Sequence, residues 1–491
     1  MTVEGKTFEE EFARASAGSA RSRESRGQGG EDAFAMSPAR GARTRAQRAP
    51  GVADACPGVL RLHEAADGTL ARVRAPGGRL DARALAALAE AAALGSGIVE
   101  LTSRAGLQVR GLSDGDAEEI ARVLAGGGLL PSITHERVRN ILAPPLAGRD
   151  PAALAPVDAL VDSLDRALCA DAALAELPGR FLFAVDDGTR ALHSLRADVE
   201  LAAERDAPWT AGAAWPAGAA RTAGAAWAGA VRTAGAARPV FRLLLDGLAT
   251  SLVVAPADAP GAALDAARAF LALREEDGEG AWRVRELRGG AVRVAERLDL
   301  TVDAGRASAS DPRRRLGLRL QRDGLLAVAA LPPLARLDRT QLLGLAELCR
   351  AQGVDVRVSP WRTLTLVDVP ACAAVGVLGA LRDIGLVTGD QSGWVGLSAC
   401  AGLGACARAL VDVRAAAGAR ARERDETSPT EHWSGCERRC GEPPDAGVSV
   451  VACERGLVVS AGDAAGAEAE RRTVATAAAA LELLERAGAR A

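Results

Sequence analysis

An internal repeat constrains this chain more than any other feature of its sequence. RLDARALAALA from Arg79 and RLDRTQLLGLA from Arg336 share Arg-Leu-Asp, with leucines at matching places behind the aspartate. Upstream, Asp67 and Asp323 each begin an Asp-Gly pair between two runs of alternating apolar residues. Asp-Gly in such a setting predicts a β-hairpin turn. The sequence therefore predicts two copies of one small unit.

Each copy continues in the same order after its first helical stretch. The segments IVELTS and LQVRGL follow in the first copy, and VDVRVSP and RTLTLVDV follow in the second, before another helical stretch. This order predicts a strand-strand-helix-strand-strand-helix unit in each copy. Because the order and the spacing both recur, chance similarity is a poor explanation.

Two larger mixed regions lie between and after the copies. The first alternates helical runs with the strand-like FLFAVDD, FRLLLDG and SLVVAPA, and the second holds GVSVVAC, GLVVSAG and an alanine-rich helix. Such alternation is typical of α/β domains. The predicted order along the chain is a tail over 1–50, a half-domain over 51–128, an α/β domain over 129–300, a second half-domain over 311–372 and a second α/β domain over 375–491.

Two segments of biased composition fall outside this pattern. Residues 1–50 carry few large apolar side chains, so burial cannot offset the entropy of ordering, and we expect a disordered tail. Acidic residues mixed through it argue against a tail that binds nucleic acid. Over 207–239 the sequence TAGAA recurs without an apolar period, which predicts a surface insertion.

Positive charge in this chain is almost entirely arginine, since Lys6 is the only lysine. No lysine beyond that position can act as a base, a Schiff-base former or an anion ligand. The 9 cysteines in 491 residues are too sparse for a secreted disulfide scaffold, and the polar start lacks a signal-peptide pattern. We expect a cytoplasmic protein without a membrane span.

Four cysteines stand in two close pairs in the last fifth of the chain. Cys400 and Cys406 in ACAGLGAC are spaced C-x5-C, and Cys436 and Cys440 in SGCERRCGEPP are spaced C-x3-C. Four thiolates are the ligand set that a [4Fe-4S] cluster requires. The two arginines inside the second pair could offset the negative charge of such a cluster. A structural zinc site and unconnected buried cysteines remain the alternatives.

The remaining cysteines and histidines indicate no second metal site. Cys349 falls on the apolar face of a repeat helix, which favours a place in the core. The four histidines share no metal-ligand spacing. His432, close before the second cysteine pair, is interpreted as a polar loop histidine, with a place beside the cysteines as the alternative.

With these motifs the chain resembles the siroheme-dependent nitrite and sulfite reductase superfamily, whose cluster cysteines have the same two spacings. Within it, LTSRAGLQVRG, VRNILAPPLAG and HWSGCERRCGEPP are similar to the precorrin-3B synthase family. The resemblance implies an α+β fold of two ferredoxin-like half-domains, related by the repeat, plus two α/β domains of the nitrite/sulfite reductase type. It also implies that the four paired cysteines ligate a [4Fe-4S] cluster.

The same resemblance implies an oxidoreductase, an oxygen-dependent monooxygenase of aerobic cobalamin biosynthesis. Such an enzyme hydroxylates a ring-bridging carbon of the anionic tetrapyrrole precorrin-3A and closes a lactone from a neighbouring acetate. Siroheme is then the less favoured cofactor. Because no G-x-G-x-x-G follows a strand and opens a helix, we expect electrons from a separate reductase or ferredoxin. Neither nucleic acid nor a membrane is an expected partner.

Six residues are carried over by position as candidates for binding the carboxylates of the substrate, which suit forked arginine contacts. They are Arg104, Gln108 and Arg110 in the first copy, Arg139 and Asn140 in the next domain, and Arg362 in the second copy. Solvent-facing arginines at strand edges are the alternative for the two that sit in such places, Arg110 and Arg362.

Two other functions stay open. Siroheme-dependent sulfite or nitrite reduction is disfavoured, because the superfamily holds its small anion with arginines and lysines and this chain has no lysine after Lys6. A non-catalytic iron-sulfur or tetrapyrrole-binding protein is the other alternative. Gly106 keeps it open, since it occupies a place where the family often has asparagine.

Overall fold

The computed structural model describes residues 56–205, 239–278, 280–306, 316–443, 446–461 and 470–488. The tail predicted over 1–50 lies outside the described residues. So does the insertion predicted over 207–239, except for its last residue. No helix in the described part of the chain is both long enough and apolar enough to cross a membrane.

The two copies of the repeat have the predicted order of elements. The first consists of β1 (His63–Ala65), β2 (Gly68–Val73), α2 (Ala82–Ala93), β4 (Ile98–Leu101), β5 (Leu107–Leu112) and α3 (Ala117–Gly126). The second consists of β12 (Gly317–Leu320), β13 (Leu326–Ala330), α7 (Arg339–Gln352), β15 (Val356–Val358), β16 (Leu364–Val369) and α8 (Ala371–Asp383).

The shared Arg-Leu-Asp motif has two structural roles. Its aspartate caps the helix that follows: Asp81 accepts a hydrogen bond from the Ala84 amide at 2.7 Å, and Asp338 accepts one from the Gln341 amide at 2.8 Å. The residues before it form a short strand that joins the sheet of the other copy.

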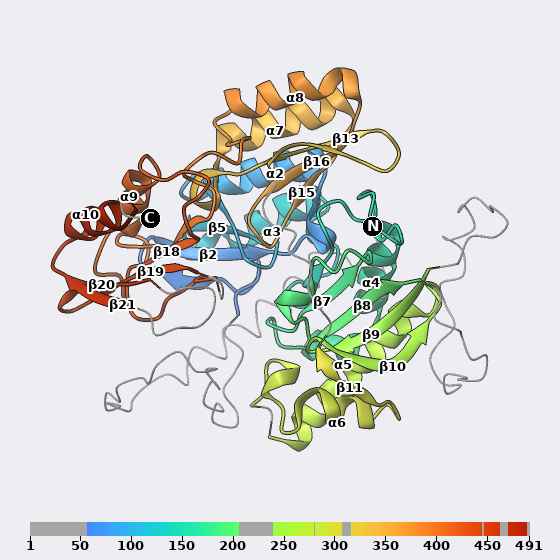
Figure 1. Cartoon of the computed structure of the whole chain (residues 1–491). Coiled ribbons are helices and arrows are strands. Elements are labelled where there is room, and N and C mark those ends of the chain that lie inside the picture. Colours follow the sequence, from blue (N-terminus) through green and yellow to red (C-terminus); the bar gives the residue numbers. More distant parts are fainter. Residues whose placement is uncertain are drawn as a thin grey trace.

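This exchange of strands interlocks the two copies. β3 (Arg79–Leu80) pairs with β15, and β14 (Arg336–Asp338) pairs with β4. The sheets therefore run β1-β2-β5-β4-β14 and β12-β13-β16-β15-β3. One apolar core includes both Leu85 of α2 and Leu342 of α7, so the two half-domains form one packed unit (Figure 1).

The first α/β domain has a mixed sheet of order β11-β10-β9-β8-β7-β6. β6, β7 and β8 are parallel to one another, and each later strand is antiparallel to its neighbour. One face packs in a core shared with α4 (Asp158–Ala170) and α5 (Ala259–Glu276), beside the short α6 (Gly290–Glu296). The strands are β6 (Ile141–Leu142), β7 (Phe183–Asp186), β8 (Val199–Glu204), β9 (Val240–Leu245), β10 (Leu248–Val254) and β11 (Val302–Arg306).

The second α/β domain begins with the same topology. β17, β18 and β19 are parallel, and β20 and β21 follow antiparallel. α9 (Val413–Arg420) and α10 (Ala477–Gly488) pack in the core of this sheet. The strands are β17 (Leu397–Ala399), β18 (Glu431–Ser434), β19 (Val448–Cys453), β20 (Gly456–Ala461) and β21 (Glu470–Val474). The internal repeat thus extends into the α/β domains.

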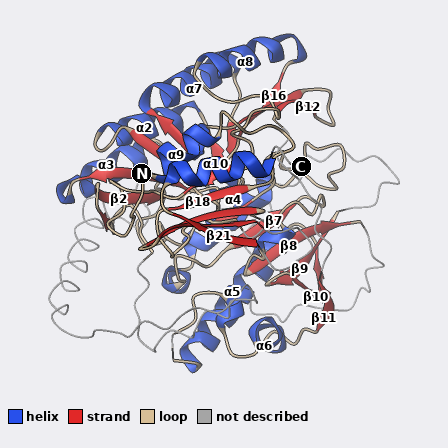
Figure 2. Ribbon diagram, turned by 60° about the vertical axis from the view of Figure 1, so that its left-hand side comes forward, coloured by secondary structure: helices blue, strands red, loops and turns tan. Residues whose placement is uncertain are grey.

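The arrangement confirms the predicted α+β fold. α7 and α8 lie along one edge of the molecule and α5 and α6 at the opposite edge, with strands between them (Figure 1 and Figure 2). One strand of the first α/β domain, β8, is not predicted from the sequence. It stands between FLFAVDD and the biased segment, so that segment connects β8 to β9 rather than β7 to β9.

Candidate iron-sulfur and anion-binding site

The four paired cysteines follow the carboxyl ends of two neighbouring parallel strands. Cys400 comes directly after β17, and Cys436 comes just after β18, which pairs with β17 in parallel register. Carboxyl ends of adjacent parallel strands meet at one edge of a sheet, a common place for ligands. The topology therefore brings together two loops that lie far apart in sequence. We call residues 400–410 and 435–441 the cysteine loops.

Close backbone contact holds the cysteine loops against each other. The Gly435 amide donates a hydrogen bond to Sγ of Cys400 at 3.1 Å, and the Leu410 amide donates to the Gly435 carbonyl at 2.8 Å. A Cβ at position 435 would lie 2.8 Å from Cβ of Ala409, so only glycine fits this crossing. Amide donation to a cysteine sulfur is one of the contacts that tune an iron-sulfur cluster.

The four thiols are electrostatic neighbours. The pKa of Cys440 is raised above its usual value, first by burial and then by Cys400, Cys436 and Cys406. Among the described residues, no three of these sulfurs lie within 4.8 Å of one another. Thiolates around a single zinc ion at about 2.3 Å would stand about 4 Å apart. The wider spacing suits a multi-iron cluster better than a single zinc ion.

The interpretation of His432 as a loop histidine is wrong. It lies in β18, fully buried, with Nδ1 2.8 Å from the hydroxyl of Ser398. Burial, followed by the charge of Arg362, lowers the pKa of His432 to about 4. A neutral imidazole therefore stands behind the second cysteine loop. Arg362 contacts the same loop by donating to the Gly441 carbonyl at 3.1 Å.

A row of polar side chains projects from one face of the first half-domain sheet. Alternation along β2 and β5 buries the apolar residues between them against the helices, on the opposite face. Arg72 stands opposite Gln108 in the register of the two strands. We call this the polar face, which consists of Arg72, Arg74, Gln108 and Arg110.

Arg110 links the polar face to the first cysteine loop. Its guanidinium binds both carboxylate oxygens of Asp67, at 2.9 and 2.8 Å, and donates to the Ala405 carbonyl at 2.7 Å. Three of its contacts are therefore made within the protein. This geometry gives Arg110 a positioning role between the half-domain and the cysteine loop, rather than a free fork for a ligand.

The hydrogen bonds of Arg72 and Arg74 go to an amide, a thiol and a carbonyl. Arg72 donates to Gln108 at 3.0 Å and to Sγ of Cys56 at 3.4 Å, and Arg74 donates to the Gly179 carbonyl at 3.4 Å. Neither forms an ion pair with a described carboxylate. Burial is the main reason why the pKa of Arg74 is lowered to about 10. Gln108 thus orients an arginine that the family pattern did not indicate.

Arg104 is a third arginine that forms no ion pair with a described carboxylate. It lies in the hairpin between β4 and β5 and donates to the Arg180 carbonyl at 2.9 Å. Burial, followed by the charge of Arg283, lowers the pKa of Arg104 to about 9. Buried charges without opposite partners cost free energy, which a bound anion would recover. We call Arg72, Arg74 and Arg104 the arginine group.

Arg139 and Asn140 have partners inside the fold. Arg139 binds both oxygens of Asp165, at 2.8 and 2.7 Å, and both residues are largely buried. The Asn140 amide donates to the carbonyls of Gly179 at 3.0 Å and Phe181 at 3.1 Å. Asn140 therefore supports the loop that faces the arginine group, whereas Arg139 is held by a carboxylate of α4.

Gly106 fits its place closely. A Cβ there would lie 3.3 Å from the Val73 carbonyl oxygen and 3.4 Å from the hydroxyl oxygen of Thr102. An asparagine would press on the end of β2, the strand that carries Arg72 and that Arg74 directly follows. The glycine is therefore matched to its immediate surroundings.

Two residues of the arginine group, Arg72 and Arg74, are missing from the sequence-based candidates. The signal that finds them is the alternation in TLARVRA, which places both on the face opposite the buried Ala71 and Val73. Arginines on the inner face of a half-buried strand are less common than arginines toward solvent, and the sequence does not say which face is covered.

Comparison with known proteins identifies the repeat. The family described as nitrite/sulfite reductase ferredoxin-like half domain matches residues 62–126 and 319–384, which are the two interlocked copies. The two copies are therefore similar to the half-domains of nitrite and sulfite reductases. This similarity agrees with the superfamily that the cysteine spacings indicated.

The individual relatives include a precorrin-3B synthase and a nitrite reductase. Precorrin-3B synthase of Sinorhizobium sp is 33% identical over 151 residues, 30% of this chain and 32% of that protein. Ferredoxin--nitrite reductase of Synechococcus elongatus is 26% identical over 417 residues, 78% of this chain and 76% of that protein. The chain thus matches about a third of the length of the synthase and about three quarters of the length of the reductase.

Solved structures support the fold as well. The structure of the Mycobacterium tuberculosis NirA protein superposes with a TM-score of 0.63 and 18% identity, covering 85% of this chain and 80% of that one. Identity this low carries the fold and no activity.

Proposed function

We propose that this protein is a precorrin-3B synthase-like monooxygenase that binds precorrin-3A through the arginine group. The observation that carries the proposal is that Arg72, Arg74 and Arg104 form no ion pair with a described carboxylate, and that Arg74 and Arg104 donate to carbonyls of the loop at 179–181. A tetrapyrrole edged with carboxylates supplies the missing charge, and forked guanidinium contacts suit it. The match to precorrin-3B synthase supports the same substrate class.

The four paired cysteines fit a [4Fe-4S] cluster and would hold it. Their sulfurs come from two loops locked together by Gly435, and their spacing is too wide for one zinc ion. A bound cluster would pass electrons one at a time. Oxygen incorporation requires such reducing power, because one atom of O2 enters the product and the other leaves as water.

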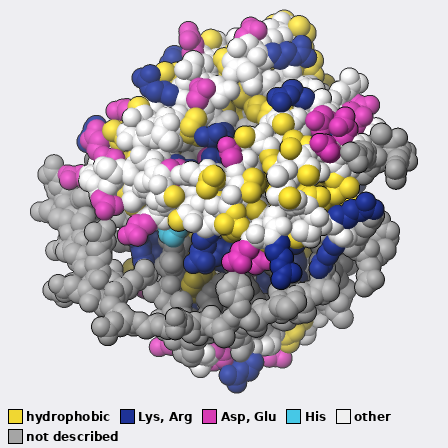
Figure 3. Space-filling model, turned by 90° about the vertical axis from the view of Figure 1, so that its left-hand side faces the viewer, with side chains coloured by type: hydrophobic (Ala, Val, Ile, Leu, Met, Phe, Trp, Pro, Cys, Tyr) yellow, Lys and Arg dark blue, Asp and Glu magenta, His cyan; other side chains and the backbone are white. Residues whose placement is uncertain are grey.

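The electron donor is proposed to be a separate reductase or ferredoxin. Cys440 is exposed, as are Arg438 in the same loop and Arg408 in the other cysteine loop. Leu403 and Leu410 of the first loop are 56% and 51% exposed. Basic and apolar side chains together suit an acidic donor protein. Figure 3 shows the side of the molecule that the second α/β domain occupies, where apolar side chains lie among both basic and acidic ones.

Within this proposal the protein's own residues bind and orient the substrate. Arg74 and Arg104 would each take a carboxylate, and Gln108 would hold Arg72 at the angle that a third contact needs. Several fixed contacts set the plane of the macrocycle, so the same ring-bridging carbon is always presented. Arg110 would act by holding the first cysteine loop in place, Asn140 by holding the 179–181 loop, and Arg139 by its ion pair with Asp165 inside the fold.

Siroheme-dependent nitrite or sulfite reduction is the second candidate. The nitrite reductase match spans 78% of the chain, and carboxylates of siroheme would suit the arginine group as well as those of a substrate do. Lysines are absent beyond Lys6, which argues against the small-anion site of such reductases. A non-catalytic iron-sulfur or tetrapyrrole-binding protein is the third.

A visible spectrum and a turnover assay separate the three candidates. Anaerobically purified protein should show the broad absorbance of an iron-sulfur cluster without an intense porphyrinoid Soret band. With O2, an electron donor and precorrin-3A, it should form a product heavier by one oxygen atom. Tightly bound siroheme with nitrite or sulfite turnover would overturn the proposal in favour of the reductase. An intact cluster with neither activity would leave the non-catalytic protein.

A further inference from the structure

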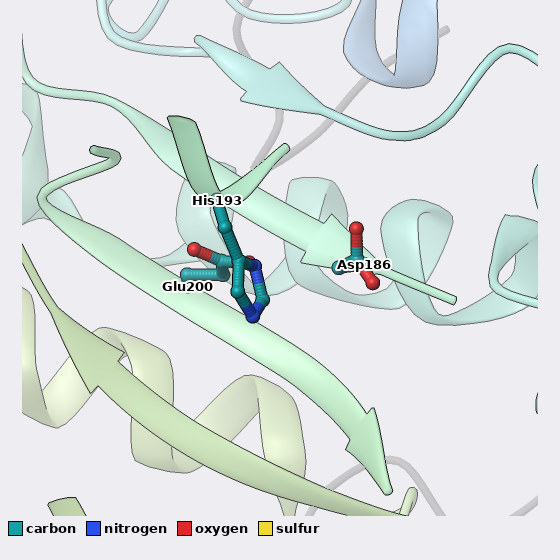
Figure 4. Close-up of side chains that lie close together, drawn as sticks. All are labelled: Asp186, His193 and Glu200. Carbon is teal, nitrogen blue, oxygen red and sulfur yellow. The ribbon is translucent and has the colours of Figure 1, made fainter. Parts of the chain in front are cut away.

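A second group of chemically active side chains lies in the first α/β domain. Asp186 ends β7, His193 lies in the 3-10 helix η4 (His193–Leu195), and Glu200 lies in β8. One ligand atom from each lies within 4.8 Å of the others, and all three residues are buried. Figure 4 shows the imidazole between the two carboxyl groups.

Strand register explains why the two carboxyl groups meet. β7 and β8 are parallel, with Ala184 opposite Glu200 and Asp186 opposite Ala202. All four side chains therefore project from one face of the sheet, where Asp186 and Glu200 are diagonal neighbours. The connection between the strands folds back through η4 and places His193 over the same face.

The carboxylate of Glu200 has few partners for a fully buried group. Its side chain is 0% exposed, and its Oε2 has no hydrogen-bond partner among the described residues. Its Oε1 forms a close ion pair with Nδ1 of His193. Asp186 is oriented by amides, since it accepts from Gly188 at 2.9 Å and Arg190 at 2.8 Å.

Several other buried carboxylates of this protein are compensated by arginine, whereas Asp187 and Glu136 accept hydrogen bonds from backbone amides. Glu431, 1% exposed, binds Arg424 at 2.9 Å and Arg420 at 3.2 Å. Among the ion pairs of the described residues, neither Asp186 nor Glu200 pairs with an arginine. A protonated His193 offsets one carboxylate at most. Two buried acids with one imidazole are therefore short of positive charge, and burial makes that shortage costly.

We propose that Asp186, His193 and Glu200 bind a divalent first-row transition-metal ion. One imidazole and two carboxylates are a ligand set for ions such as Fe2+, Mn2+ or Zn2+, since imidazole favours these metals over Mg2+ and Ca2+. Oε2 of Glu200 supplies a ligand atom that the fold itself does not use. This site is separate from the paired cysteines and does not rest on the proposed function.

Mn2+ is the probe that tests the site, because it is distinguishable from the iron of a cluster. The full-length chain is produced in medium supplemented with Mn2+, so that the ion is present while the protein folds. After removal of loose metal, the wild type should retain close to one Mn2+ per chain by elemental analysis. Glu200→Gln and Asp186→Asn should each weaken retention by at least about tenfold, as loss of a ligand removes its bond to the ion.

The matched control is Glu204→Gln, which changes a carboxylate of the same strand that pairs with Arg242 instead. It should retain Mn2+ as the wild type does. Unchanged Mn2+ in Glu200→Gln, or no retained Mn2+ in the wild type, would overturn the proposal and leave a buried His193–Glu200 ion pair. If the variants fail to fold, the test is whether the Mn2+ retained by the wild type shows magnetic coupling to a histidine nitrogen. Coupling supports the site, and its absence refutes it.

Discussion

Replacing Arg104 by glutamine separates ligand binding from folding in the proposed substrate site. The arginine has one protein partner, the Arg180 carbonyl at 2.9 Å, and a glutamine amide can still donate toward that carbonyl. The substitution removes a largely buried charge that no described carboxylate pairs with. We therefore expect little change in the stability of the fold and a clear loss of affinity for a carboxylated tetrapyrrole.

The expected loss follows from the kind of contact that disappears. A hydrogen bond between a guanidinium and a carboxylate contributes about 1.5 to 3 kcal/mol. That range corresponds to an increase of about 10- to 150-fold in Kd. The upper part of the range applies where water is excluded, and burial is the largest influence on the Arg104 pKa.

Binding is measured by titrating the anaerobic protein with precorrin-3A and following the change in visible absorbance. The control is Arg122→Gln, which removes an equal charge from an exposed position on α3, where Glu119 is its partner. The control should bind like the wild type. A Kd for Arg104→Gln within about threefold of the control would refute the idea that Arg104 binds the ligand, since it leaves less than 1 kcal/mol for the contact.

Three further outcomes are expected. Arg139→Met should lower the free energy of unfolding by about 3 kcal/mol, because it leaves the carboxylate of Asp165 without its bidentate arginine partner. A urea midpoint equal to that of the wild type would contradict this. Serine in place of any one of the four paired cysteines should abolish the iron-sulfur absorbance. Cys349→Ser should retain this absorbance, because Cys349 is a core residue of α7 whose pKa is raised by burial to about 12. A short Gly-Ser turn in place of 206–238 should leave the melting temperature almost unchanged, since Glu204 and Val240 already stand opposite each other in the β8–β9 pair; loss of folded protein would show that the segment contributes to the core.

Local patterns of the sequence determine much of the architecture. The Asp-Gly turns, the alternating strands and the helices capped by Asp81 and Asp338 are all short-range features, and each forms where the pattern predicts it. The paired cysteines are likewise recognisable from spacing alone. These features depend on residues close together in the chain, so the linear sequence is enough to place them.

Only the tertiary structure decides which side chains share a site. The exchange of β3 and β14 between the copies and the crossing at Gly435 depend on contacts between distant segments. The same holds for the guanidiniums: Arg139 and Arg104 look alike in sequence, yet one meets the carboxylate of Asp165 and the other meets only a carbonyl. A guanidinium with a carboxylate partner stabilises the fold, whereas one without such a partner can bind a ligand. Long-range packing decides whether a carboxylate lies beside it.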